Sequence, residues 1–274
     1  MSRVFDALRQ VQDAPLDTDL VIRTMPQLAD APFGLEAAET VEARLSPESR
    51  LIVHGEPHTL GADRFRLLRV RFRELRANRK LQTVLITSAL PREGKSTTAL
   101  NLSVALAEHG RSKVVLVEAD FRQPSLPGRL GLEPWPALVR CLEEDRDPMA
   151  AIRRVDPLDI YLLPAGEAAA NPLDLLNSES FAHTINALRA CADWVIIDAP
   201  PVGPVPDVLA IKGRADGCLW VLQAGSTPRE LVDESIQQVG RTSILGMVLN
   251  GVDGMESGYS SYYGYNSGSS RPSR

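Results

Sequence analysis

One segment constrains the fold of this chain more than any other: residues 84–110 read VLITSALPREGKSTTALNLSVALAEHG. An apolar run typical of a strand enters a loop that ends Gly-Lys-Ser-Thr at residues 94–97, and an amphipathic helical pattern follows until Gly110. Backbone N–H groups at such a helix start point toward phosphate oxygens, and the helix dipole favours the negative charge. The segment therefore predicts a phosphate-binding loop between a strand and a helix.

This loop predicts a site for ATP and Mg²⁺. Lys95 would place a positive charge on the terminal phosphates, and Ser96 would offer a hydroxyl to the metal ion. The strict pattern GxxxxGK[ST] is not met, because Ala89 stands where its first glycine would be. A capped helix with an exposed lysine is the plainer alternative, but the flanking strand and helix favour a nucleotide site. Its expected contacts are Pro91, Arg92, Glu93, Gly94, Lys95, Ser96 and Thr97.

Apolar runs and helical patterns alternate along the middle of the chain. Several runs are apolar at consecutive positions, which is typical of strands covered on both faces. Such alternation predicts a doubly wound α/β fold like that of P-loop NTPases, with a mainly parallel sheet and helices on both faces. The predicted strands are residues 84–87, 114–118, 160–164, 194–198, 218–223 and 244–250.

Acidic residues end two of the predicted strands. Glu118 and Asp120 lie two apart, so on an extended chain their side chains point the same way. Asp198 follows a fully apolar run and is positioned to hold Mg²⁺ or its water. Any one of them could simply cap a strand end. Because strand ends of an open α/β sheet surround its ligand site, the three acids together predict catalytic and metal-binding roles.

Composition divides the chain into three parts. Residues 1–60 contain scattered prolines and many acidic or small residues, which favours a flexible tethering arm; a helix at its start could instead dock on the domain. Residues 61–253 carry the motifs and form the expected ATP-binding domain. Residues 254–274 are dominated by Gly, Ser and Tyr, and we expect this tail to be disordered.

Charge, cysteines and hydropathy exclude several classes of protein. The net charge of -5 gives no reason to expect nucleic-acid binding. The three cysteines match no metal or redox spacing and are typical of reduced, buried thiols in a cytoplasmic protein. No apolar run approaches the length needed to cross a bilayer, and no signal peptide is evident.

The tail concentrates tyrosine where no core is available to bury it. The chain has five tyrosines, and four of them fall within residues 259–265. A buried tyrosine normally packs its ring and bonds its hydroxyl, which a Gly/Ser-rich segment does not allow. We interpret these phenols as phosphate acceptors; a low-complexity tail with no covalent fate is the alternative. The candidate acceptors are Tyr259, Tyr262, Tyr263 and Tyr265.

Together these motifs resemble those of the bacterial tyrosine kinases of capsule and exopolysaccharide synthesis. The loop SALPREGKST is similar to the family pattern S-x-x-P-G-x-G-K-S-T, and VLVEADFR is similar to three apolar residues followed by D-x-D-x-R. IIDAPP matches the third family motif, and a C-terminal tyrosine cluster is the family's hallmark. The resemblance covers roughly residues 61–265.

The resemblance implies roles for individual residues. Lys95 and Ser96 would bind phosphates and Mg²⁺, Asp198 would belong to the metal site, and Asp120 would support it through water. Glu118 takes the position of the acid that accepts the proton of the attacking tyrosine. Asn250 ends a strand where related ATPases meet adenine. The family forms rings through a helix of pattern E-x-x-R-x-x-R, and the matching residues are Asp63, Arg66 and Arg69, although a solvated helix face is the plainer alternative.

The resemblance also implies a biological setting. The tail tyrosines would be phosphorylated by neighbouring copies in a ring-like homo-oligomer, and the added charge, roughly -1.5 to -2 per phosphate, would loosen the ring. Expected partners are a membrane-embedded polysaccharide co-polymerase as adaptor and a cognate phosphotyrosine phosphatase. The chain would be cytoplasmic and recruited to the inner face of the membrane, where it would regulate polymer synthesis and export.

Two positions depart from the family pattern and keep other functions open. Arg92 replaces a glycine, so it would either strain the loop or add a cation over the γ-phosphate. Glu118 replaces an aspartate, which changes reach rather than acidity. A catalytically weak, ATP-binding scaffold is therefore one alternative. A partition or cell-division ATPase is another, but those enzymes carry a lysine where this chain has Leu90, and they lack a tyrosine tail.

Overall fold

A single sheet of eight strands organises the computed structural model, which describes residues 34–252. The strand order is β1-β4-β5-β3-β6-β2-β7-β8, and every neighbouring pair is parallel except β4 with β5. The strands are β1 (Glu39–Glu42), β2 (Thr83–Ser88), β3 (Val114–Glu118), β4 (Arg153–Asp156), β5 (Ile160–Leu163), β6 (Trp194–Asp198), β7 (Gly217–Gln223) and β8 (Ile244–Asn250).

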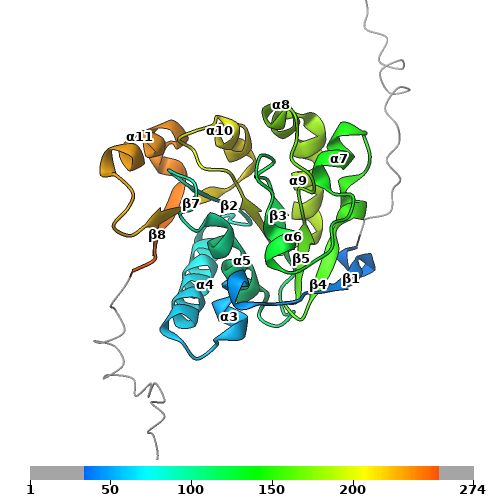
Figure 1. Ribbon diagram of the computed structural model, residues 1–274, viewed down its shortest axis with the longest axis horizontal. Helices are drawn as coiled ribbons and strands as arrows, with labels where there is room; N and C mark the ends of the chain where they lie inside the picture. The colour runs from blue at the N-terminus through cyan, green and yellow to red at the C-terminus, as the bar shows by residue number, and fades with distance from the viewer. Residues whose placement is uncertain (1–33, 253–274) are drawn as a thin grey trace, which may run out of the picture. The chain divides into compact units, whose positions relative to one another are not determined.

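Helices cover both faces of this sheet, as the alternating pattern predicts (Figure 1). One face carries α3 (Ile52–Gly55), α4 (Leu60–Asn78), α5 (Lys95–Ala107) and α6 (Leu126–Arg129). The other carries α7 (Leu138–Glu143), α8 (Pro172–Asn177), α9 (Glu179–Cys191), α10 (Asp207–Ile211) and α11 (Arg229–Val239). Short 3₁₀ turns are η1 (Leu35–Ala37), η2 (Pro47–Ser49), η3 (Pro148–Ala151), η4 (Lys212–Arg214) and η5 (Arg241–Ser243). The fold is the P-loop NTPase-like doubly wound architecture.

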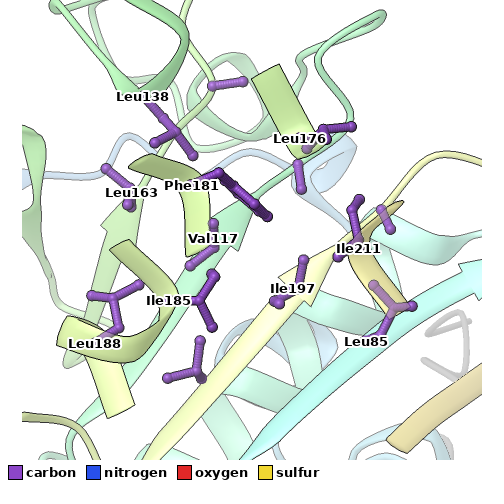
Figure 2. Close-up of a cluster of buried hydrophobic side chains, with 14 of the residues drawn as sticks. Leu85, Val117, Leu138, Leu163, Leu176, Phe181, Ile185, Leu188, Ile197 and Ile211 are labelled. Atoms are coloured by element: carbon purple, nitrogen blue, oxygen red, sulfur yellow. The ribbon is translucent and has the colours of Figure 1, made fainter. Parts of the chain in front are cut away.

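The core forms two layers because alternate strand residues point to opposite faces. Figure 2 shows one layer, in which Phe181 and Ile185 of α9 pack near Val117 of β3 and Ile197 of β6. These side chains are almost fully buried. Full burial of such a side chain stabilises the fold by about 1.5–3 kcal/mol. The double cover explains the uninterrupted apolar runs and fixes the strand ends that carry the acidic residues.

All six predicted strands are present, and two more were not predicted. β1, at the edge of the sheet, and its neighbour β4 are short, polar strands whose sequences, ETVE and RRVD, bury at most one residue each. Because β1 pairs with β4 and Leu35 is 1% exposed, residues from 34 onward pack with the sheet. The packed domain therefore begins before residue 61, and the predicted arm is correspondingly shorter. Residues 1–33 and the tail from 253, with all four candidate tyrosines, lie outside the described residues.

A search of residues 34–252 for membrane spans finds no helix with the length and hydropathy needed to cross a bilayer.

Candidate active site

The phosphate loop connects β2 to α5 and ends at Gly94. Gly94 has a φ of +96°, and a Cβ added there would lie 2.1 Å from the side-chain nitrogen of Asn250. Both the left-handed backbone and the absence of space require glycine at this position. The chain can therefore turn from the loop into α5 at Gly94, the residue before the helix.

Arg92, which replaces a glycine of the family pattern, has the backbone conformation that glycine adopts most easily. Its φ is +65°, in the left-handed region that costs a residue with a Cβ about 1–2 kcal/mol. The side chain is exposed and lines the cavity beside the loop. The loop thus keeps the backbone shape suited to glycine and gains a cation at the cavity edge.

Glu93 has a different position from the other loop residues. Its side chain is 3% exposed and accepts hydrogen bonds from the Leu90 N–H at 2.7 Å and from the Thr227 hydroxyl. The Asn250 amide donates to the Glu93 carbonyl at 3.1 Å. The carboxylate therefore fastens the loop to the residues after β7. The sequence predicts Glu93 as a nucleotide contact, but its side chain does not line the cavity. Contact between Asn250 and adenine stays a prediction.

A cavity of about 810 Å³ opens beside the phosphate loop. Its walls come from the loop and α5, the segment after β3, α6, the segment after β6, and residues that precede α3. The lining residues that carry the later argument are Glu48, Arg50, Pro91, Arg92, Gly94, Lys95, Ser96, Thr97, Asp120, Arg122, Ser125 and Arg129.

Asp198 lies at the end of β6 and is 1% exposed. Burial raises the pKa of its carboxyl to about 7, although a hydrogen bond from Ser96 and the charge of Lys95 act in the opposite direction. Its Oδ1 atom has no hydrogen-bond partner within residues 34–252. A buried carboxylate oxygen without a partner is costly, so its presence beside Ser96 and Lys95 indicates a ligand site.

This arrangement fits Mg²⁺. The ion prefers oxygen ligands, and in nucleotide sites it usually takes one or two protein oxygens together with phosphate oxygens and water. The Ser96 hydroxyl and the unpartnered Asp198 oxygen supply that donor set. No group of three or more His, Cys, Asp or Glu side chains in the described part of the chain is arranged to hold a metal ion.

Glu118 occupies the equivalent position on β3 but does not face the cavity. Its Oε1 accepts the N–H groups of Ser125 and Leu126, the latter at 2.7 Å, and its Oε2 accepts the N–H of Ala165 at 3.0 Å. The side chain is buried, and burial raises the pKa of its carboxyl in spite of these donors. The geometry therefore gives Glu118 a structural role and does not support the expected role as proton acceptor.

Asp120 lines the cavity beside the phosphate loop, and its catalytic and metal-supporting role stays a prediction. Burial raises the pKa of its carboxyl, while the hydrogen bond from the Gln123 N–H and the charge of Lys95 lower it. Nearby, the Arg122 guanidinium forms two hydrogen bonds to the buried Asp207, at 2.7 and 3.0 Å. This pair fixes the segment after β3 against α10 and leaves Asp120 beside the phosphate loop.

The three residues predicted at a subunit interface lie along α4. Arg66 pairs with Asp63 at 2.7 Å, and both side chains are partly exposed, at 39% and 42%. Arg69 pairs instead with Glu108 of the same chain at 3.0 Å. The sequence spacing thus places Asp63 and Arg66 on an accessible face, whereas Arg69 also holds α4 to the end of α5.

Sequence reasoning missed the cavity residues contributed from outside the motifs. Arg50 and Glu48 come from the region assigned to the arm, and Arg129 comes from the short helix α6. None belongs to a recognisable pattern, so no sequence signal could have identified them. Their presence depends on how the chain before α3 packs against α5.

Comparison with known proteins gives consistent matches. The chain is 32% identical over 221 residues to the tyrosine-protein kinase YwqD of Bacillus subtilis, covering 79% of this chain and 92% of that protein. It is 32% identical over 247 residues to the succinoglycan biosynthesis transport protein ExoP of Rhizobium meliloti, of which it spans 31%. The solved BceF tyrosine kinase domain has a TM-score of 0.65 and 26% identity, covering 78% of this chain and 92% of that domain. No protein-family model matches.

Proposed function

The chain belongs to the bacterial tyrosine-protein kinases, and we propose that it transfers the γ-phosphoryl group of ATP to tyrosines in the C-terminal segment of a neighbouring copy. Membership makes the chain a protein-tyrosine kinase. The proposed acceptors are Tyr259, Tyr262, Tyr263 and Tyr265. The observation that carries the proposal is the buried Asp198 oxygen without a partner, held beside Ser96 and Lys95 at the base of the phosphate loop.

In this proposal the phosphate loop and α5 bind the nucleotide. Backbone N–H groups at the start of α5 face the phosphates, and Lys95 neutralises charge that moves toward the β–γ bridge oxygen as the bond breaks. Ser96 and Asp198 would hold Mg²⁺, which when bound shields the charge of the phosphates. Arg92 adds a second cation at the cavity edge.

The transfer step needs an in-line acceptor and a destination for one proton. The tyrosine oxygen forms a bond to the γ-phosphorus, the bond from that phosphorus to the β-phosphate oxygen breaks, and ADP leaves. The phenol proton passes to a carboxylate. We assign this role to Asp120, because it lines the cavity beside Lys95 while the carboxylate of Glu118 is fully engaged by backbone donors. Burial raises the pKa of Asp120, which makes it a better proton acceptor.

The cellular role is proposed from the relatives. ExoP is named for succinoglycan biosynthesis and transport, which supports a place for this chain in exopolysaccharide polymerisation and export, alongside a membrane-embedded co-polymerase. A ring of copies that meet through Asp63, Arg66 and Arg69 would bring each C-terminal segment to its neighbour. A phosphotyrosine phosphatase would return the modified segments to their starting state.

The first experiment tests autophosphorylation. Purified full-length protein is incubated with ATP and Mg²⁺ and phosphotyrosine is mapped by mass spectrometry, beside a Lys95→Met variant. We expect phosphate on the four C-terminal tyrosines of the wild type and none in the variant. Wild-type protein that stays unmodified at every tyrosine would reject the proposal.

A mixing experiment tests transfer between copies. An active chain in which all four tail tyrosines are phenylalanine is combined with the Lys95→Met chain, which keeps its tyrosines. Phosphate on the Lys95→Met chain is the expected result, because only a neighbouring copy can supply it. Wild-type modification together with no transfer in the mixture would restrict the reaction to transfer within one chain.

One observation favours a second function. The engaged carboxylate of Glu118 and the strained Arg92 are compatible with an ATP-binding scaffold that regulates assembly without phosphorylating tyrosine. ATP binding with no phosphate transfer in either experiment, even with the membrane partner added, would support this alternative.

A further inference from the structure

We propose that Arg50 is a phosphate-binding residue of the nucleotide cavity, delivered by the segment before α3. The inference rests on the proposed nucleotide-binding function. Arg50 precedes the phosphate loop by some forty positions in the sequence, yet it lines the same cavity as Lys95 and Thr97. It is exposed and forms no ion pair within residues 34–252. Its guanidinium is therefore available to a ligand.

Asn101 connects Arg50 directly to α5. The amide nitrogen of Asn101 donates to the Arg50 carbonyl at 2.8 Å and to the Thr97 carbonyl at 2.9 Å, and its amide oxygen accepts the Val53 N–H at 3.1 Å. Asn101 is fully buried. Because buried polar groups held by several hydrogen bonds are rigid, the backbone of Arg50 is fixed to the helix whose first turn faces the phosphates.

A second anchor holds the same segment to α6. The buried Ser49 hydroxyl donates to the Arg129 carbonyl at 2.6 Å. Arg129 lines the cavity as well, and its guanidinium approaches the Thr97 hydroxyl at 3.5 Å. Arg50 and Arg129 thus both line the part of the cavity near Thr97, which lies in the first turn of α5.

The backbone of Arg50 is held in a conformation that its side chain disfavours. Its φ and ψ are +49° and +38°, in the left-handed region. Left-handed residues other than glycine persist where the surroundings impose them, and they concentrate at ligand sites. Glycine would adopt this conformation more readily, so replacing Arg50 with glycine removes the side chain without disturbing the backbone.

The charges around the cavity favour a polyphosphate. Two of its lining residues are acidic, Glu48 and Asp120, whereas the cations are Arg50, Arg92, Lys95, Arg122 and Arg129. Arginine binds phosphate through paired, charge-assisted hydrogen bonds, which makes it well suited to this ligand. Arg50 therefore adds a cation to a cavity whose charged lining is mainly positive.

The test measures the affinity of the full chain for Mg·ATP and Mg·ADP by calorimetry. We expect Arg50→Gly to weaken binding by about tenfold or more, as loss of a hydrogen bond to a charged group does. Arg50→Lys should lose part of that affinity. Arg44→Gln is the matched control, because Arg44 lies in the same segment but does not line the cavity. The unfolding midpoint of Arg50→Gly without nucleotide should equal or exceed that of the wild type.

Each outcome has a definite meaning. A loss confined to ATP would assign Arg50 to the γ-phosphate, and an equal loss for ADP would assign it to the inner phosphates. Unchanged affinity for both nucleotides would overturn the inference, even if binding of a phosphotyrosine peptide were weakened instead. Wild-type protein that binds neither nucleotide would reject the proposed function itself. The two failures are distinguishable, because the inference about Arg50 fails only when the wild type binds nucleotide and Arg50→Gly binds it equally well.

Discussion

The ends of β3 and β6 carry acids at paired positions, but the two carboxylates have opposite environments. Glu118 and Asp198 are register partners on these parallel strands. Three backbone N–H groups engage Glu118, whereas one oxygen of Asp198 has no partner within the described residues. Of these two paired acids, Asp198 is therefore the one whose carboxylate remains available to a ligand.

The strongest test of this difference is Asp198→Asn. We expect the rate of tyrosine phosphorylation to fall by about a thousandfold, because the site would lose a metal-holding carboxylate and the charge compensation it allows. Phosphate incorporation over time measures the rate. Asp174→Asn, on the exposed side of α8, is the control and should be unaffected. A variant with wild-type activity would show that Asp198 is structural.

The same carboxylate predicts a pH dependence of stability. Its pKa is about 7 in the folded protein and 3.8 in the reference state, so the folded form binds the proton more tightly. The contribution of Asp198 to the free energy of unfolding, without ligands, should therefore be greatest below about pH 4. It should decrease by up to about 4 kcal/mol as the pH rises through about 7.

Urea unfolding across that pH range measures the effect. In Asp198→Asn the free energy of unfolding should change little between pH 4 and pH 7, because the asparagine side chain cannot ionise. This variant should therefore be more stable than the wild type at pH 8. Parallel pH profiles for the two proteins would contradict the interpretation of Asp198.

Removing the acid of β3 should have the opposite consequence. Glu118→Ala leaves three backbone N–H groups without their acceptor, and each buried, unpaired donor costs about 1–3 kcal/mol. We expect the free energy of unfolding to fall by about 3 kcal/mol or more, while the activity of the folded fraction changes little. If stability is unchanged and activity is lost, Glu118 is catalytic after all.

The smallest expected effect concerns Arg92. Arg92→Gly should raise the free energy of unfolding by about 1 kcal/mol, because glycine adopts the left-handed backbone without the Cβ penalty. Thermal unfolding without nucleotide measures the gain, and Arg111→Gly at another exposed position should give none. A destabilised Arg92→Gly protein would mean that the side chain makes contacts that outweigh the strain.

The sequence predicts the sheet better than the site. Apolar runs such as residues 194–198 identify strands because both faces are buried, and the phosphate loop follows from its Gly-Lys-Ser between a strand and a helix. The polar strand β1 gives no such signal. The orientation of Glu118 depends on N–H groups at Ser125, Leu126 and Ala165, and no local pattern specifies those contacts.

Arg50 is a cavity residue that no sequence motif indicates. Its place in the cavity follows from hydrogen bonds made by Asn101, which lies on a helix about fifty residues later in the chain. Motifs therefore reveal the residues that follow strands directly, whereas residues brought in by packing become visible only in the structure.

The measurement that tests the central claim most directly is the effect of Mg²⁺ on ATP affinity, determined by calorimetry in the wild type, Asp198→Asn and Glu118→Gln. The account predicts that Mg²⁺ strengthens ATP binding in the wild type and in Glu118→Gln but not in Asp198→Asn. An undiminished Mg²⁺ effect in Asp198→Asn, or its loss in a folded Glu118→Gln protein, would contradict it.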